Sequence, residues 1–181
     1  MTDLPKQYAW LEAEPGPRIL VEALKTYGTI EKPGEGSNPS ILAWSKITGL
    51  DRIYRNDATA WCGLWMAYMA LQAGWDVPMN PLGARNWLAF GVPQQKPALG
   101  DVLVFWRGAS SGLSGHVGLY FGEDAQAFHV LGGNQSDRVM IKRIAKKRLL
   151  GVRRCPWRIN QPAGVRPVVL AASGALSTNE A

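Results

Sequence analysis

The sequence predicts an α+β protein in which helices come first and an antiparallel sheet follows. Before Pro97, apolar residues recur at helical spacing between glycines and prolines; after it, the apolar segments are short and rich in Val, Ile and aromatic residues. The length of 181 residues, with 46% hydrophobic and 19% charged residues, suits one folded domain and excludes a disordered chain. We therefore expect N-terminal helices packed on a C-terminal sheet.

Capping residues and glycines predict where the helices begin and end. Residues 17–27 have apolar side chains at helical spacing and stop at Gly28. Asn38 is placed to cap a second helix, because Pro39 suits the first helical position. Two further helices are expected, an uncharged one over residues 58–73 with Asp57 as its cap and a short one over residues 85–90.

Several segments after Pro97 have the length and composition of strands. They are DVLVFW, HVGLYF, AFHVL and RVMIKRI, and clusters of Gly, Ser or Asp separate them. From residue 160 the chain has no aromatic residues and becomes rich in Ala, Ser, Pro and Val. We expect a single domain over residues 1–159 and a flexible tail or linker stub over residues 160–181.

The hairpin between HVGLYF and AFHVL sets the expected register of the sheet. Residues 122–126 are expected to form its loop. If Phe121 faces Ala127 across the hairpin, His116 lies opposite Gly132. Side chains two positions apart then share a face of the sheet.

Cys62 is a candidate nucleophile because it stands near the start of the uncharged helix. A catalytic cysteine works as a thiolate, which the positive end of a helix dipole and a nearby imidazole both favour. The alternative is a buried structural thiol, because Trp61, Trp65 and Met69 form an apolar stripe beside it. With Cys155 as its only possible disulfide partner in the chain, the sequence is not that of a disulfide framework.

His116 favours the catalytic interpretation of Cys62. It opens a predicted strand after the small-residue loop SSGLSG, which leaves one edge of the imidazole open to a cleft. A cysteine at a helix N-terminus followed by a histidine on a later strand is the order found in papain-like folds. In that arrangement the two side chains meet between helix and sheet.

A histidine base needs a partner on its second ring nitrogen, which fixes the tautomer and the orientation of the ring. In the expected register Asn134 lies on the same face as His116, whereas His129 lies on the opposite face. Asn134 is therefore the candidate partner. The alternative is that Asn134 only turns the chain within GGNQSD.

Five segments together resemble one protein family. They are WCGLW around Cys62, ARNWLAFG, PALGDVLVFWRG, GHVGLYFG around His116 and VLGGNQSDRV around Asn134. In this order and over residues 8–157, the sequence resembles the CHAP/NlpC-like cysteine peptidoglycan hydrolases of bacteria and phages. The resemblance implies a papain-like fold and cleavage of an amide bond, either between muramic acid and L-alanine or within the stem peptide.

By this resemblance Cys62 is the nucleophile, His116 the base and Asn134 the residue that orients the imidazole. NlpC-type relatives usually have a histidine as the third member, and many CHAP domains have a Glu or Asn. Asn56 occupies the position where papain-like enzymes often place an oxyanion-hole side chain, and its amide can donate a hydrogen bond. Asp57 cannot donate when ionised and is better explained as a cap. The backbone N–H of Cys62 is the other expected oxyanion donor.

The positive charge is concentrated, because residues 138–158 contain nine of the 20 Lys and Arg and no acidic residue. One interpretation is a solvated strand edge. Another is a surface patch that attracts anionic polymers of the cell envelope. Nucleic-acid binding is a third and weaker interpretation, because no stacking platform, zinc-finger spacing or recognition helix accompanies the positive charge. The patch would consist of Lys142, Arg143, Lys146, Lys147 and Arg148.

The predicted function is a thiol-dependent peptidoglycan amidase or endopeptidase, endolysin-like or injected. No cofactor or metal is expected, because there are two histidines, no HExxH and no CxxC pair. The alternative functions are an inactive wall-binding module and a basic nucleic-acid-binding domain.

The N-terminus lacks a Sec-type signal, so we expect synthesis in the cytoplasm and access to the wall or periplasm through a holin, injection or host lysis. We expect residues 58–75 to form a core helix rather than a membrane span, because the segment contains Thr59, Gln72 and two glycines.

Overall fold

The computed structural model describes residues 4–157 and 160–180. Helices dominate the first half of this part of the chain and strands the second half, so the predicted α+β class is confirmed. The helical elements are η1 (Lys6–Ala13), α1 (Arg18–Leu24), α2 (Pro39–Ile47), α3 (Cys62–Gln72), η2 (Ala84–Ala89) and η3 (Lys146–Arg148), where η denotes a 3-10 helix. The strands are β1 (Val92–Gln94), β2 (Val102–Trp106), β3 (Gly115–Glu123), β4 (Ala127–Gly132), β5 (Met140–Ala145), β6 (Leu149–Arg154) and β7 (Leu176–Ser177).

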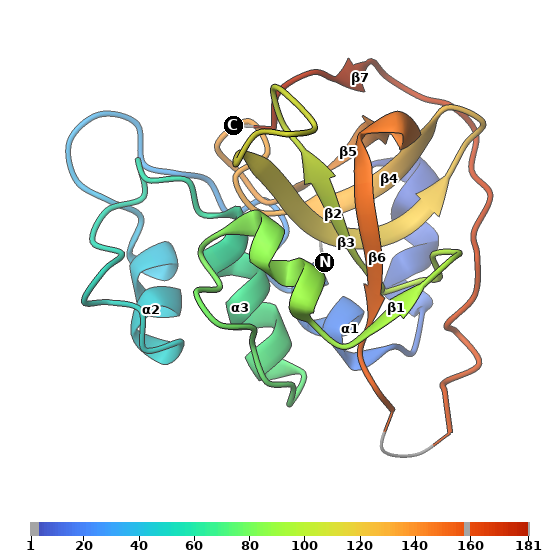
Figure 1. The fold of residues 1–181 in the computed structure, drawn as a ribbon, viewed down its shortest axis with the longest axis horizontal. Coiled ribbons are helices and arrows are strands. Elements are labelled where there is room, and N and C mark those ends of the chain that lie inside the picture. Colours follow the sequence, from blue (N-terminus) through green and yellow to red (C-terminus); the bar gives the residue numbers. More distant parts are fainter. Residues whose placement is uncertain (1–3, 158–159, 181) are drawn as a thin grey trace.

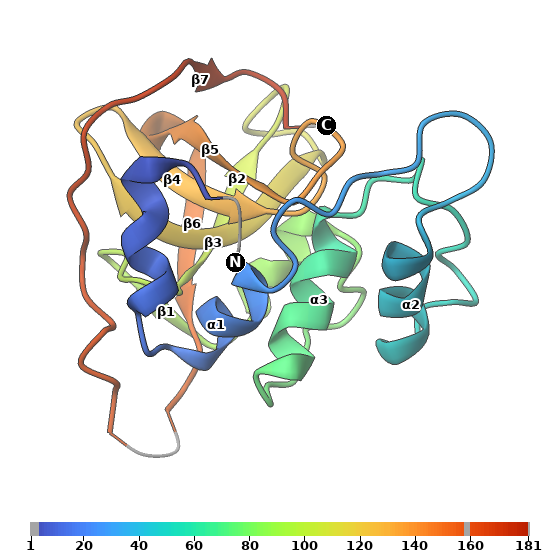
Figure 2. The ribbon, with the colours of Figure 1, turned by 180° about the vertical axis from the view of Figure 1, so that it is seen from behind.

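Within the described residues the strands form one seven-stranded sheet, in the order β1-β6-β2-β3-β4-β5-β7. Neighbouring strands are antiparallel except β5 and β7, which are parallel. The sheet is strongly curved; α3 lies against it, and α2 lies beyond α3, farther from the strands (Figure 1). Seen from behind, η1 crosses the sheet near β4 (Figure 2).

The capping signals located α2 correctly, whereas α1 ends at Leu24, before the expected stop at Gly28. The Asn38 side chain accepts a hydrogen bond from the first turn of α2, and Pro39 is the first residue of that helix. However, α3 begins at Cys62, later than expected, because Asp57 does not cap it. Asp57 Oδ2 instead accepts the backbone N–H groups of Lys32 (3.0 Å) and Asn38 (2.7 Å). In the part of the chain that the structure describes, no helix combines the length and apolar character needed to cross a bilayer.

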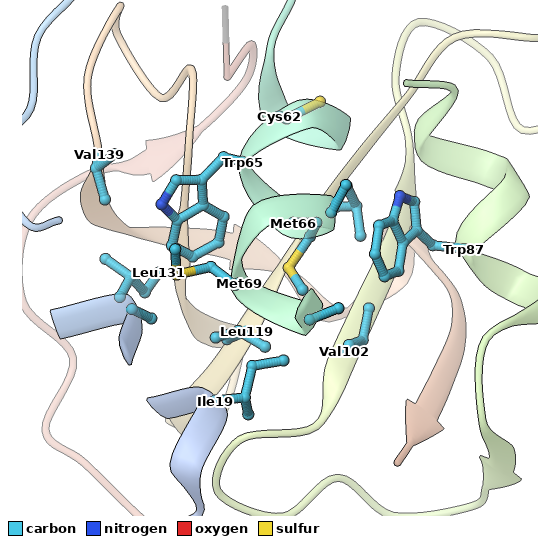
Figure 3. Packing of buried hydrophobic residues seen from close by; sticks show 14 of the residues in the cluster. Ile19, Cys62, Trp65, Met66, Met69, Trp87, Val102, Leu119, Leu131 and Val139 are labelled. Carbon is cyan, nitrogen blue, oxygen red and sulfur yellow. The ribbon is translucent and has the colours of Figure 1, made fainter. Parts of the chain in front are cut away.

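The larger hydrophobic cluster forms around α3. Trp65, Met66 and Met69 are fully buried and pack with strand residues such as Leu119 and Leu131 (Figure 3). Burial of each such side chain contributes roughly 1.5–3 kcal/mol. A smaller cluster lies on the other face of the sheet, because alternate residues of the strands point there. The packing holds α3, and therefore its first residue, in a fixed position on the sheet.

The four predicted strands are present, but the register of the hairpin differs from the prediction. Leu119 pairs with Leu131, whereas pairing Phe121 with Ala127 would have placed Leu119 opposite His129. An irregularity of the ladder at Phe121 shifts the remaining pairs. On the His116 side of this irregularity, the observed register differs from the predicted register by an even number of residues. The side chains there therefore keep their expected faces.

Residues 160–180, which we call the C-terminal strap, pack along the sheet, in contrast to the flexible tail expected after residue 159. Strand β7 pairs with β5, the N–H of Leu170 donates to the carbonyl of Glu123, and Glu180 is fully buried. The strap ends beside the loop between β4 and β5 (Figure 1). Its low aromatic content concealed this packing, because many of its contacts are backbone hydrogen bonds and ion pairs.

Candidate active site

Cys62 is the first residue of α3, and its sulfur lies where that helix meets the start of β3. The backbone N–H groups of Val117 and Gly63 hydrogen-bond to the sulfur. Figure 3 shows Cys62 in the first turn of the helix, with Trp65, Met66 and Met69 in the turns that follow. The residue is only 7% exposed. The thiol is thus held between a helix N-terminus and the strand that carries His116.

Burial raises the pKa of the Cys62 thiol. The two N–H groups and the positive charge of Arg107 act in the opposite direction but do not reverse the shift. The resting thiol is therefore protonated at neutral pH, and a base must remove its proton before or during any attack. Cys155 is also a free thiol, and burial together with the charge of Asp101 raises its pKa to about 12.

His116 lies at the start of β3, where it pairs with Phe105 of β2. Its ring is buried, and Nε2 lies 3.2 Å from Oε1 of Gln135. Burial lowers the pKa of His116 to about 4, although the negative charge of Glu180 and the hydrogen bond with Gln135 oppose the shift. The imidazole is therefore neutral at pH 7 and able to accept a proton.

Gln135, rather than Asn134, provides the side chain that contacts His116. Its amide nitrogen donates to the backbone carbonyls of Val130 (3.1 Å), Gly132 (3.4 Å) and Met140. These acceptors fix the orientation of the amide, so its oxygen faces the ring. An acceptor opposite Nε2 requires hydrogen on Nε2, which leaves Nδ1 as the basic nitrogen.

Asn134 belongs to a turn in which strand alternation no longer applies. Strand β4 ends at Gly132, and Asn134, Ser136 and Asp137 have positive φ angles of 56°, 52° and 58°. These left-handed residues rotate the chain, so the side chain that reaches His116 comes one position later than predicted. The alternative interpretation of Asn134, as a residue that turns the chain, agrees with this geometry.

Two glycines let this turn approach its neighbours closely. A Cβ atom on Gly132 would lie 2.9 Å from Nε2 of His116, and one on Gly133 would lie 2.6 Å from Cβ of Trp65. The chain therefore contacts the imidazole through one glycine and α3 through the next. The expected placement of Gly132 on the His116 face is confirmed.

Cys62 and His116 are brought to the same end of β3. Val117, whose N–H reaches the sulfur, directly follows His116, and the charge of Arg107 lowers the pKa of both groups. Within residues 4–157 and 160–180, no hydrogen bond joins the sulfur to the ring. In hydrolases without substrate this bond is often long and tightens only in the complex.

The two residues expected near the oxyanion site lie in the loop before α3. Asn56 is exposed, and its Oδ1 accepts the hydroxyl of Thr59 at 3.1 Å, which leaves its NH₂ group as a donor. Asp57 is buried. Burial disfavours its ionisation, but the backbone N–H groups that it accepts hold the pKa of Asp57 below the usual value. Asp57 holds the loop before α2 and does not cap the start of α3, where it was expected.

The expected basic patch is not a continuous surface. Arg143 and Arg148 are buried and pair at 2.7 Å with Asp124 and Glu180 respectively. The prediction is wrong for these two arginines, because a buried cation requires a partner and is not available to a polymer. The members of the patch that remain at least partly exposed are Lys142, Lys146 and Lys147.

Glu180 lies beside the candidate site although it was expected in a flexible tail. Its two carboxylate oxygens accept Nη1 and Nη2 of Arg148, each at 2.7 Å. Its backbone carbonyl accepts the N–H of Ser136 at 2.8 Å. Since Ser136 follows Gln135, the strap is attached to the turn that orients His116. No motif marks Glu180, because its partners are distant in the sequence.

His129 is part of a separate buried network on the opposite face of β4, where alternation placed it. Its Nδ1 lies 2.6 Å from the hydroxyl of Tyr8, and its Nε2 lies 2.9 Å from Oδ2 of Asp124. Arg143 Nε donates to the same oxygen at 2.7 Å. The network joins η1 to the sheet.

No protein-family model matches the sequence, and no curated protein matches it. Among the described residues, no group of three or more His, Cys, Asp or Glu side chains is placed to hold a metal ion. The candidate site consists of Cys62, His116 and Gln135.

Proposed function

We propose that the protein is a cysteine-dependent peptidoglycan hydrolase, an amidase or endopeptidase with a papain-like fold. The observation that carries the proposal is the position of Cys62 at the start of α3, against the backbone of the residue that follows His116. Gln135 holds the second nitrogen of that imidazole. The resemblance of WCGLW, GHVGLYFG and VLGGNQSDRV to the CHAP/NlpC-like hydrolases supports peptidoglycan as the substrate.

The first half of the proposed reaction forms a thioester. His116 Nδ1 accepts the thiol proton while the Cys62 sulfur attacks the amide carbonyl, whose π electrons move to oxygen. No side chain caps the N-terminus of α3, so the backbone N–H of Cys62 is suited to stabilise this oxyanion. The C–N bond then breaks, and His116 returns the proton to the leaving amine.

The second half releases the product. A water molecule attacks the thioester, His116 accepts one of its protons, and the Cys62 sulfur leaves and is reprotonated, which yields a carboxylic acid. Because the thiol has a raised pKa and the imidazole a lowered one, proton transfer accompanies the attack instead of preceding it.

A wall-binding module without catalysis is the second candidate, and the low exposure of Cys62 favours it. In that case the thiol and the imidazole are packing residues. A nucleic-acid-binding domain is disfavoured, because the burial of Arg143 and Arg148 removes two cations from the expected patch.

Digestion of purified peptidoglycan followed by mass spectrometry tests the proposal. We expect the wild-type protein to release fragments with one new amine and one new carboxyl end, which identify the bond cleaved. Cys62→Ala should bind the polymer and release nothing. Equal binding by both proteins without any fragment from the wild type would support the wall-binding module instead.

A further inference from the structure

Arg107 lies at the end of the sheet that carries the candidate site. It directly follows β2, in which Phe105 pairs with His116 and Trp106 pairs with Gly115. Its positive charge acts on both Cys62 and His116. The side chain is therefore near the reacting groups although it contacts neither by a hydrogen bond within the described residues.

A hollow of about 420 Å³ lies beside Arg107, and its other lining residues are Gly108, Ser114, Thr178 and Asn179. One wall is the loop between β2 and β3. Arg85 holds this loop by donating, at 3.0 Å each, to the backbone carbonyls of Ala109, Ser110 and Ser114. This wall is thus fixed before any ligand arrives.

The second wall is the end of the C-terminal strap, with Thr178 and Asn179. Arg148 holds this segment on both sides of those residues, through the carbonyl of Ser177 at 3.2 Å and the carboxylate of Glu180. Both walls are therefore held by arginines, Arg85 and Arg148, that donate hydrogen bonds to other groups of the protein. Side chains on the two walls end in hydroxyl or amide groups, which suit a polar ligand.

Arg107 differs from three other arginines on or beside this sheet. Arg143, Arg148 and Arg154 each pair with a carboxylate at 2.7 Å. Among the described residues Arg107 pairs with no carboxylate, and its side chain reaches only Oδ1 of Asn179, at 3.5 Å. A half-buried guanidinium with unused donors, at the rim of a polar hollow, matches the planar geometry of a carboxylate.

We propose that this hollow is a substrate subsite in which Arg107 binds a carboxylate of the peptidoglycan stem peptide. The inference rests on the proposed function, because it requires a substrate that presents one amide to Cys62 and one carboxylate to Arg107. The fork of the guanidinium orients the peptide as well as attracting it. Arg107 thereby determines which stem peptides are cleaved.

Two stem-peptide fragments that differ only in a free or an amidated carboxyl group test the subsite. For the free carboxylate, Arg107→Gln should raise KM roughly ten- to a hundredfold, the range for hydrogen bonds to a charged group. For the amidated fragment KM should change less than about threefold. Arg107→Lys should restore part of the preference, because it keeps the charge and loses the fork. Lys46→Gln, which removes an exposed cation on α2, away from the sheet, is the matched control and should leave the preference unchanged.

The preference between the two fragments is the decisive quantity, because loss of the Arg107 charge also alters the pKa of Cys62 and so changes kcat for both. If the wild type shows no preference, or if Arg107→Gln affects both fragments equally, the subsite is refuted while the hydrolase proposal stands. If the wild type cleaves neither fragment, the hydrolase proposal fails, and calorimetry with Cys62→Ala decides the subsite. Tighter binding of the free carboxylate that Arg107→Gln abolishes would support it, and equal binding would refute it.

Discussion

Oε1 of Gln135 lies 3.2 Å from Nε2 of His116, and the backbone carbonyls around the amide leave it no other orientation. This contact determines which ring nitrogen is basic. The orienting group is an amide, so it remains uncharged at every pH at which the protein is folded. The ionisation behaviour of the site therefore depends on Cys62, His116 and the charges around them.

Gln135→Ala should lower turnover on a defined muropeptide by roughly ten- to a thousandfold, because the imidazole loses its orienting acceptor while Cys62 and His116 remain. Asn134→Gly is the matched control, since glycine tolerates the positive φ at that position. Its turnover should stay near that of the wild type. A silent Gln135→Ala together with an impaired Asn134→Gly would show that the neighbouring amide orients the ring.

Cys62→Ala should abolish the release of peptidoglycan fragments and change the free energy of unfolding by no more than about 1 kcal/mol. Cys155→Ala should keep its activity, because the Cys155 thiol has a pKa of about 12 and is not a ready nucleophile. Fragment release and chemical denaturation measure the two effects separately. An inactive Cys155→Ala that is still folded would show that Cys155, rather than Cys62, is the nucleophile.

The dependence of kcat/KM on pH should report the lowered pKa of His116. Protonation of the free enzyme removes the base, so the acid limb should lie near pH 4 instead of near pH 6.5. Glu180→Gln should move this limb to still lower pH, because the Glu180 carboxylate stabilises the imidazolium. An acid limb at pH 6–7 in the wild type would contradict the buried, neutral imidazole.

Stability should fall as the pH drops below about 6.5, the pKa of histidine in an unfolded chain. Burial lowers the pKa of both His116 and His129 in the folded state, so below that pH the unfolded chain binds more protons than the native protein.

His129→Asn should lower the free energy of unfolding at pH 7, because Tyr8 and Asp124 lose their shared partner. The same variant should lose less stability between pH 7 and pH 5 than the wild type, with turnover per folded molecule preserved. Denaturant titrations at both pH values check this, and an equal loss in the two proteins would contradict it.

Local sequence signals placed Cys62 near a helix start and His116 at a strand start, although α3 begins later than its expected cap at Asp57 indicated. Gln135 was missed because alternation was extended past Gly132 into a turn with left-handed residues, where the rule has no basis. A count of charges predicted a basic surface but could not show that Arg148 meets Glu180, which lies 32 positions later. Tertiary ion pairs of this kind leave no periodic pattern in the sequence.

The outermost strands of the sheet are both very short: β1 has three residues, including Pro93, and β7 has two. Open strand edges carry unpaired N–H and C=O groups on which other chains can add. Because β1 contains a proline and β7 has only two residues, these two edges offer few unpaired backbone groups to which another strand could bind. The strap that reaches the candidate site thus also shields β5, and a chain without it would be prone to edge-to-edge aggregation. Protein recovered after loss of these residues would need to be tested for self-association before any loss of activity were assigned to the site.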